Sequence, residues 1–265
     1  MKFIGMLLAV LLHWRTRPPL DWPARWQPVV APGVAPLFGL TLGPALVAAL
    51  LLWLCGSWLW GLLGLALQVA VLVGCLGGTD RRRLFDDLIA DGERGDLQAA
   101  LHTLEQLGPV TERSEVADGA ALRRVATEVL ALRGLREWFA VLFWFGLLGA
   151  PGALLYRCLE RVAVASGRGR SALAVLDWPA LRAFGLVAAL AGHPGRALGA
   201  WAGTLFSALD PAQRAGGYAA AALDELPDGL PAGAALAIQV RALEALLARA
   251  VLAWLALVAV AWILS

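Results

Sequence analysis

The chain has 265 residues, of which 60% are hydrophobic and 16% are charged, and its mean hydropathy is +0.70. Soluble globular domains carry about 25% charged residues, so the composition excludes an ordinary soluble protein and predicts an integral membrane protein. The net charge of +2 excludes the strongly basic surface that is typical of nucleic-acid-binding proteins. We therefore expect a lipid bilayer, and no nucleic acid, as a partner.

Residues 1–33 are expected to form an apolar anchor followed by a basic linker. Lys2 and the apolar run behind it resemble a secretory signal peptide. The small-x-small pattern of a signal-peptide cleavage site does not follow the apolar run, so we expect the segment to be retained. A helix of about 12 residues is too short to span a bilayer. The anchor is therefore expected to lie at the membrane surface or against other helices.

Residues 34–79 are expected to form a transmembrane hairpin. No charged residue occurs between Trp26 and Thr79, which leaves room for two helices of about 20 residues each. The turn is expected at Cys55–Gly61, where Gly, Ser and tryptophans cluster. Because arginines both precede and follow the hairpin, the positive-inside rule places its two ends in the cytoplasm. These arginines are Arg15, Arg17, Arg25, Arg81, Arg82 and Arg83.

Residues 80–137 are polar and are expected to form a cytoplasmic helical segment. Asp96 is predicted to cap a helix that carries Leu97, Leu101 and Leu104 at helical spacing. A second helix is predicted further along the segment. Its charged residues either form a solvated face or mark the surface on which a cytoplasmic protein partner docks.

An uncharged stretch begins at Trp138 and contains the sequence Gly149-Ala-Pro-Gly152, which predicts a break in the helix. If this stretch spans the membrane, the arginines from Arg157 onward lie outside, against the positive-inside rule. If it re-enters and turns back at the break, they stay inside, and broken backbone at membrane depth is tolerated where protein buries it. The charge rule slightly favours the re-entrant arrangement.

The stretch LDWPALRAFGLVAALAG (Leu176–Gly192) places two charges in an apolar run. Asp177 is predicted to cap a helix that has Pro179 in its first turn. Arg182 lies on the apolar part of that helix, where an ionised group requires a partner. The candidate partners are Asp177, Glu160 and the phosphate of a headgroup or ligand.

The remaining elements complete an all-α integral membrane protein. Residues 181–191 and 197–209 are predicted to form a hairpin of two helices, each about half a membrane thickness long, so that 138–209 is one segment. Residues 210–247 are expected to be a polar connector, and 248–265 a C-terminal transmembrane helix. The predicted fold is thus a helical bundle with a transmembrane hairpin, re-entrant or half-length helices and a cytoplasmic helical segment.

Motifs of common catalytic chemistry are missing from the sequence. Lys2 is the only lysine, so no phosphate-binding loop of the Walker type is present. Neither a Gly-x-Ser-x-Gly nor a His-Glu-x-x-His motif occurs. The three cysteines and three histidines are scattered, which predicts neither a disulfide framework nor a metal site. We expect no catalytic residue, no cofactor and no metal.

Two stretches of the sequence resemble a known family. LFWFGLLGAPGALLYR (Leu142–Arg157), followed by LDWPALRAFGLVAALAG, is similar to the CobD/CbiB and AmpE group of bacterial inner-membrane proteins. The order of elements is similar too: an apolar hairpin, a cytoplasmic helical segment, the GAPG segment and the Asp–Arg helix. The resemblance implies a multi-pass protein of the bacterial inner membrane.

CobD/CbiB proteins are membrane enzymes of cobalamin biosynthesis that join an aminopropanol unit to a corrinoid carboxylate, and the sequence departs from their pattern. Residues 128–133 read Glu-Val-Leu-Ala-Leu-Arg. The corresponding sequence pattern of these enzymes is similar to Glu-Ser-Val-Ala-Glu-Asn. After Tyr156 and Arg157, Ala163-Val-Ala165 stands in place of Asp-Ser-Met, although Gly167 is retained. Aliphatic side chains cannot bind or activate a substrate through polar groups, so the departures imply loss of the enzymatic activity.

Two sequences resemble AmpE more specifically: Leu176-Asp-Trp178, at the start of the stretch above, and AGHPGRALGAW. Pro179 is one position earlier than the proline of the AmpE pattern. AmpE proteins are linked to induction of chromosomal β-lactamase and to cell-wall recycling. The resemblance implies a regulatory membrane protein of the β-lactam response and cell-wall recycling, and it does not supply a ligand. Our first hypothesis from the residues is a non-enzymatic signalling modulator that binds a small anionic ligand. The candidate ligand-binding residues are Tyr156, Arg157, Asp177 and Arg182. The alternatives are an adenosylcobinamide-phosphate synthase of the CobD/CbiB type and a purely structural membrane partner.

Overall fold

The computed structural model describes residues 2–16, 34–55, 62–76, 80–107, 119–205, 207 and 210–264. Within these ranges every regular element is a helix, which confirms the predicted all-α class. The chain divides into two compact units. Unit 1 consists of Met1–Thr79, Arg136–Ala180 and Leu255–Ser265, and unit 2 consists of Asp80–Leu135 and Leu181–Trp254.

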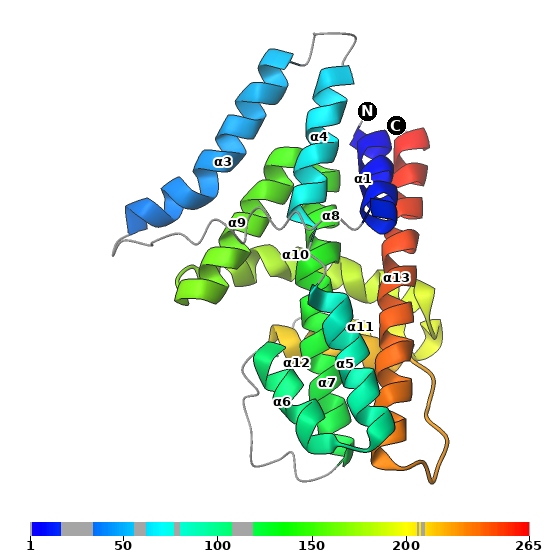
Figure 1. Cartoon of the computed structure of the whole chain (residues 1–265). Helices are drawn as coiled ribbons and strands as arrows, with labels where there is room; N and C mark the ends of the chain where they lie inside the picture. Colours follow the sequence, from blue (N-terminus) through cyan, green and yellow to red (C-terminus); the bar gives the residue numbers. More distant parts are fainter. Residues whose placement is uncertain are drawn as a thin grey trace. The chain divides into compact units, whose positions relative to one another are not determined.

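Unit 1 is organised around one central helix, α9. Its α-helices, labelled in Figure 1, are α1 (Lys2–Thr16), α3 (Val34–Cys55), α4 (Leu62–Cys75), α8 (Ala140–Leu148) and α9 (Ala150–Ser166). Most of the π-helical turn η3 (Leu135–Phe139) also belongs to this unit. The first part of α10 (Arg170–Ala191) and the end of α13 (Ala232–Leu264) complete the unit. Helix α9 packs against α3, α4 and α8, while α1 packs against α4 and α8.

The helix break expected in the GAPG sequence lies at Gly149, between α8 and α9. Gly149 has a φ of 76°, in the left-handed region that glycine adopts without steric cost. Its N–H donates to the carbonyl of Phe145 at 2.7 Å and so closes the end of α8. Pro151 lies in the first turn of α9, where a backbone N–H is not needed. Whether this segment re-enters the membrane stays a prediction.

Unit 2 is a second helical assembly. Its helices are α5 (Asp80–Arg94), α6 (Leu97–Leu107), α7 (Gly119–Gly134), α11 (Pro194–Thr204) and α12 (Pro211–Ala222), together with the remaining parts of α10 and α13. Helix α6 packs against α5 and α7, and α12 packs against α7 and α11. The predicted cap at Asp96 is confirmed, because its carboxylate accepts the N–H of Ala99 at 2.9 Å.

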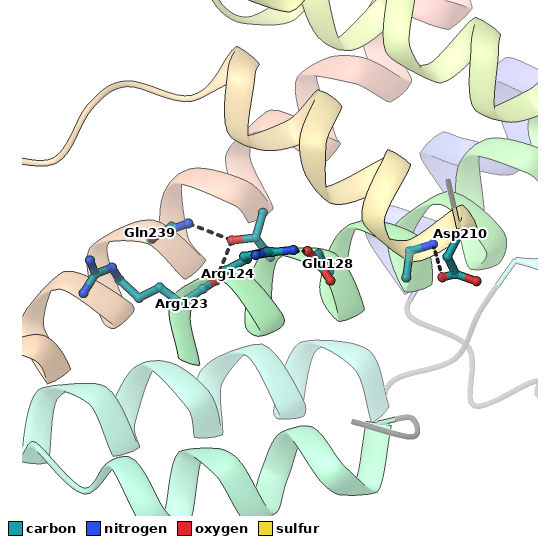
Figure 2. A network of polar contacts seen from close by, with 7 residues as sticks. Arg123, Arg124, Glu128, Asp210 and Gln239 are labelled. Atoms are coloured by element: carbon teal, nitrogen blue, oxygen red, sulfur yellow. Dashed lines mark hydrogen bonds and ion pairs between the residues drawn. The ribbon is translucent and has the colours of Figure 1, made fainter. Parts of the chain in front are cut away.

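The contact between α7 and α12 is close because a glycine faces it. A Cβ atom built on Gly216 would lie 2.8 Å from the Cα of Glu128, inside van der Waals contact. Figure 2 shows the polar groups around this contact: Glu128 pairs with Arg124 at 3.0 Å, and Gln239 donates to the hydroxyl of Thr127 at 2.7 Å. Side-chain bonds and close backbone packing therefore join α7 to both α12 and α13.

Two described helices are long and apolar enough to cross a membrane, judged by length and composition. They are Arg170–Ala191 in α10 and Ala232–Ala261 in α13. The first corrects the expected half-length helix at 181–191, since α10 has 22 residues and begins eleven positions earlier, at Arg170. Gly167 and Gly169, with φ values of 70° and 76°, end α9 and lead into α10.

The last helix also begins earlier than the expected residue 248. Helix α13 has 33 residues and starts at Ala232, inside the stretch expected to be a polar connector. Ala and Leu dominate this stretch, and they are strong helix formers. The predicted turn at residues 56–61 and the arginines Arg17 and Arg25 lie outside the described residues, so the orientation of the hairpin stays a prediction.

Two neighbouring glycines of α12 test the α7–α12 contact. Gly216→Ala should destabilise the protein by about 1–3 kcal/mol, because the new methyl group overlaps Glu128. Gly217→Ala is the matched control: nothing lies within 4 Å of its built Cβ, so a gain in helix propensity of up to about 1 kcal/mol is expected. Thermal unfolding in detergent, followed by tryptophan fluorescence, measures both. An equal rise in Tm for both variants would contradict the described contact.

Candidate functional site

Unit 1 contains a buried carboxylate that accepts hydrogen bonds on both of its oxygens. The side chain of Asp177, on α10, is 1% exposed. Arg136 donates to Oδ2 of Asp177 from Nε at 3.0 Å and from Nη2 at 2.8 Å. The hydroxyl of Tyr156, on α9, donates to Oδ1 at 2.6 Å. Charge-assisted hydrogen bonds of this kind are roughly twice as strong as neutral ones. We call these three residues the Asp177 cluster.

Local helix geometry places each member of the Asp177 cluster. Arg136 lies on η3, the π-helical turn, and single π-helical turns are frequent at functional sites. Tyr156 is fully buried near the middle of α9, the central helix of the unit. The cluster therefore joins three elements, η3, α9 and α10, through side chains that come from distant parts of the sequence.

A second buried ion pair lies on α9, directly after Tyr156. Nη1 of Arg157 is 3.0 Å from Oε2 of Glu160, one helical turn further on. The side chain of Arg157 is 2% exposed, and Arg161 approaches the same carboxylate oxygen at 3.9 Å. Glu160 also lies within electrostatic range of Arg136 and Tyr156. The two pairs thus form one extended network of opposite charges.

The structure brings together three of the four ligand-binding residues predicted from the sequence. The fourth, Arg182, lies in the other unit. Tyr156 and Asp177 are in direct contact, and Arg157 lies beside them along α9. Arg182 belongs to unit 2, where its Nη2 donates to the carbonyl of Leu205. The partners of Asp177 are Arg136 and Tyr156, and not the Arg182 that was one of the expected candidates.

The predicted role of Asp177 as a helix cap is wrong. Helix α10 begins at Arg170, so that Asp177 and Pro179 lie in its interior and not at its start. The carboxylate therefore points to Arg136 and Tyr156 instead of to backbone N–H groups. Arg136 was missed by sequence reasoning because it follows a polar helix, where a charged residue is ordinarily solvated. Its position two residues before the apolar stretch at Trp138 was the only signal available.

The chemistry of the Asp177 cluster is that of a closed structural network. Oδ2 of Asp177 accepts two hydrogen bonds from the guanidinium of Arg136, and Oδ1 accepts one from the phenol of Tyr156. A general base must come within hydrogen-bond reach of a substrate proton, and this carboxylate is 1% exposed and already bonded through both oxygens. Among the described residues, no group of three or more His, Cys, Asp or Glu side chains is arranged to hold a metal ion.

A double-mutant cycle tests the energy of the cluster. Asp177→Leu and Arg136→Leu should each lower the free energy of unfolding by about 3–5 kcal/mol, because each leaves a buried charge unpaired. The double variant should cost clearly less than the sum. Tyr156→Phe should cost about 1–2 kcal/mol. The measurement is reversible unfolding in mixed SDS micelles.

The control for this cycle is the exposed pair of Arg124 and Glu128, at 3.0 Å, in which Arg124 is 72% exposed. Arg124→Leu should change the free energy of unfolding by less than about 0.5 kcal/mol. If Asp177→Leu were as mild as this control variant, Asp177 would not be held as a buried ion pair.

Comparisons with known proteins show which family the chain belongs to. The cobalamin biosynthesis protein CobD of Chromobacterium violaceum is 30% identical over 185 residues, which cover 62% of this chain and 58% of CobD. The match thus spans somewhat more than half the length of that relative. No solved structure matches the chain. The model of one family, described as "Regulatory signalling modulator protein AmpE", matches residues 12–215. Because this match covers well over half of the chain and contains the Asp177 cluster, the chain belongs to the AmpE family.

Proposed function

We propose that the protein is a non-enzymatic, multi-pass protein of the bacterial inner membrane that modulates β-lactamase induction and cell-wall recycling. The family match over residues 12–215 supports the regulatory role, because the family is described as a signalling modulator. The link to β-lactamase follows from the resemblance of the Leu-Asp-Trp and AGHPGRALGAW sequences to AmpE.

The apolar surface supports membrane association. Beyond the two helices that are long enough to cross a bilayer, α3 exposes large apolar side chains in a continuous series: Leu46, Val47, Leu50, Leu51 and Trp53. In water such a surface would promote aggregation, whereas in a bilayer lipid tails cover it. We propose that α3 and α4 form the transmembrane hairpin.

One observation carries the non-enzymatic part of the proposal: the buried ions of unit 1 are bound to one another. Asp177 is closed by Arg136 and Tyr156, and Glu160 is closed by Arg157. Polar residues of the CobD/CbiB pattern are replaced on the same helix by the aliphatic Ala163–Ala165. Among the described residues of unit 1, the buried carboxylates of Asp177 and Glu160 are thus each paired with an arginine.

We further propose how such a network takes part in signalling. An anionic ligand competes with Asp177 for Arg136 and with Glu160 for Arg157, because guanidinium groups bind carboxylates and phosphates in the same way. Exchange of partners would release Asp177 and Tyr156 and loosen the link between η3, α9 and α10. Residues 80–137, of which Asp80–Leu135 belong to unit 2, are proposed as the surface for a cytoplasmic partner.

The relative named CobD supports a second candidate, an enzyme of cobalamin biosynthesis. The alignment reaches 58% of that protein, and the identity alone does not transfer its activity. A cobalamin-synthesis mutant that carries this gene decides between the two. Growth on the corrinoid precursor would contradict the non-enzymatic proposal, and failure to grow while the protein is present in the membrane agrees with it.

Induction of β-lactamase tests the regulatory role. The gene is expressed in a host that has an inducible chromosomal β-lactamase and lacks its own AmpE-family protein, and nitrocefin hydrolysis is measured after exposure to a β-lactam. The wild-type chain should shift induction by several-fold, and the conservative variant Asp177→Asn should abolish that shift because it removes the charge that Arg136 binds.

The control for the induction assay is Arg196→Gln, which removes an exposed arginine of unit 2 outside residues 80–137, and membrane levels of every variant are compared by immunoblot. Equal induction by wild-type protein, Asp177→Asn and an empty vector would contradict the proposed role.

A further inference from the structure

Helix α10 contains a proline in its interior, at Pro179. Proline has no backbone N–H, so the hydrogen bond that would run to the carbonyl of Val175 is missing. The proline ring also crowds that carbonyl, and sharp helix bends occur at such positions. Pro179 therefore divides α10 into a first part, 170–178, and a second part, 180–191, which bend against each other more easily than the two halves of a regular helix.

The second part of α10 is held by α11 and α12. Gly185 lets one aromatic side chain from each of these helices lie against the backbone of α10. A Cβ atom built on Gly185 would lie 2.6 Å from Cδ1 of Trp201 and 2.8 Å from Cδ2 of Tyr218. Nε1 of Trp201 also donates to the backbone carbonyl of Arg182 at 3.0 Å. These contacts all lie on the C-terminal side of Pro179, so they do not fix the first part.

The first part of α10 is held by the Asp177 cluster. Asp177 lies two residues before Pro179, and its side chain is buried. Arg136 donates to it twice, at 3.0 and 2.8 Å, and Tyr156 donates once, at 2.6 Å. Arg136 lies on η3, which is itself an irregular, π-helical turn. One ion pair therefore connects two positions at which helix geometry is irregular, η3 and the turn before Pro179.

We propose that the Asp177 cluster is the lock of a bend in α10 at Pro179. While Arg136 and Tyr156 hold Asp177, the two parts of α10 form one continuous helix. When Asp177 loses these partners, the first part turns about Pro179, and the second part stays on α11 and α12. A buried carboxylate that loses its cation is strongly unfavourable and must move toward another partner or toward water. The inference rests on the proposed function for its trigger, the competing anion, whereas the lock itself acts in the protein alone.

Distance measurements between two spin labels on α10 test the lock. The labels are attached at Ala172→Cys and Leu190→Cys, which are both exposed positions. A regular helix places them on one face, about five turns or about 27 Å apart along its axis. The full-length protein is studied in lipid nanodiscs by pulsed electron paramagnetic resonance. Its native cysteines are first replaced by alanine, and this background must keep the Tm of the wild-type protein: Cys55, Cys75 and Cys158.

The background protein should give one narrow distance distribution. Asp177→Asn should shift this distribution by several ångström or add a second population, because asparagine carries no charge for Arg136 to bind. Tyr156→Phe removes one of the three hydrogen bonds to Asp177 and should cause a smaller change of the same kind. It takes the place of Asp177→Asn if that variant does not fold.

Two further variants locate the bend and control for a general loss of stability. Pro179→Ala restores the missing backbone N–H, so the combination of Asp177→Asn with Pro179→Ala should return the distribution to that of the background protein. Asp91→Asn is the matched control. Asp91 is also a buried aspartate that is bonded to an arginine, Arg94, and to the hydroxyl of Thr103 at 3.3 Å, but it lies on α5. Its substitution should leave the distance on α10 unchanged.

Three results would overturn the proposal: an unchanged distribution in Asp177→Asn and Tyr156→Phe, a change that persists when Pro179→Ala is added, or an equal change in Asp91→Asn. Because the measurement uses neither a ligand nor β-lactamase, its failure is distinguishable from failure of the proposed function. Loss of induction in Asp177→Asn with unchanged distances refutes the lock alone. A changed distance with normal induction supports the lock and contradicts the regulatory role of the cluster.

Discussion

The carboxylate of Asp177 fixes the arrangement of unit 1, because two side chains from distant parts of the sequence close its two oxygens. Arg136 comes from the π-helical turn and Tyr156 from the central helix α9. An ionised carboxylate inside an apolar helix is unfavourable by several kcal/mol when it is alone, so η3, α9 and α10 must keep their relative positions. The neighbouring pair of Arg157 and Glu160 extends the same constraint along α9.

This constraint also explains what the network can do. In the cluster the carboxylate of Asp177 already contacts the guanidinium of Arg136, and the phenol of Tyr156 already donates to that carboxylate. In the proposed mechanism the network has two states, closed by internal partners or opened by a competing anion, and a regulatory protein needs a two-state element of this kind. Membership of a family described as signalling modulators agrees with that use of buried charge.

Local signals in the sequence predicted local structure correctly. Asp96 caps its helix, and the GAPG sequence breaks the chain at Gly149, because capping and glycine conformation depend on adjacent residues only. The start of α10 was misplaced, since Asp177 looks like a cap until a distant arginine is known to bind it. Arg136 is separated from Asp177 by 41 positions, and no periodicity in a single sequence reports such a contact.

The most direct test of the account is the ionisation state of Asp177 in lipid. Isotope-edited infrared difference spectroscopy between wild-type protein and Asp177→Asn, both reconstituted in vesicles, isolates the bands of this one side chain. The account predicts the loss of a carboxylate band, because Arg136 binds Asp177 as an ion pair. Loss of a protonated carboxyl band instead would contradict it, since a neutral Asp177 cannot hold the guanidinium of Arg136 as an ion pair.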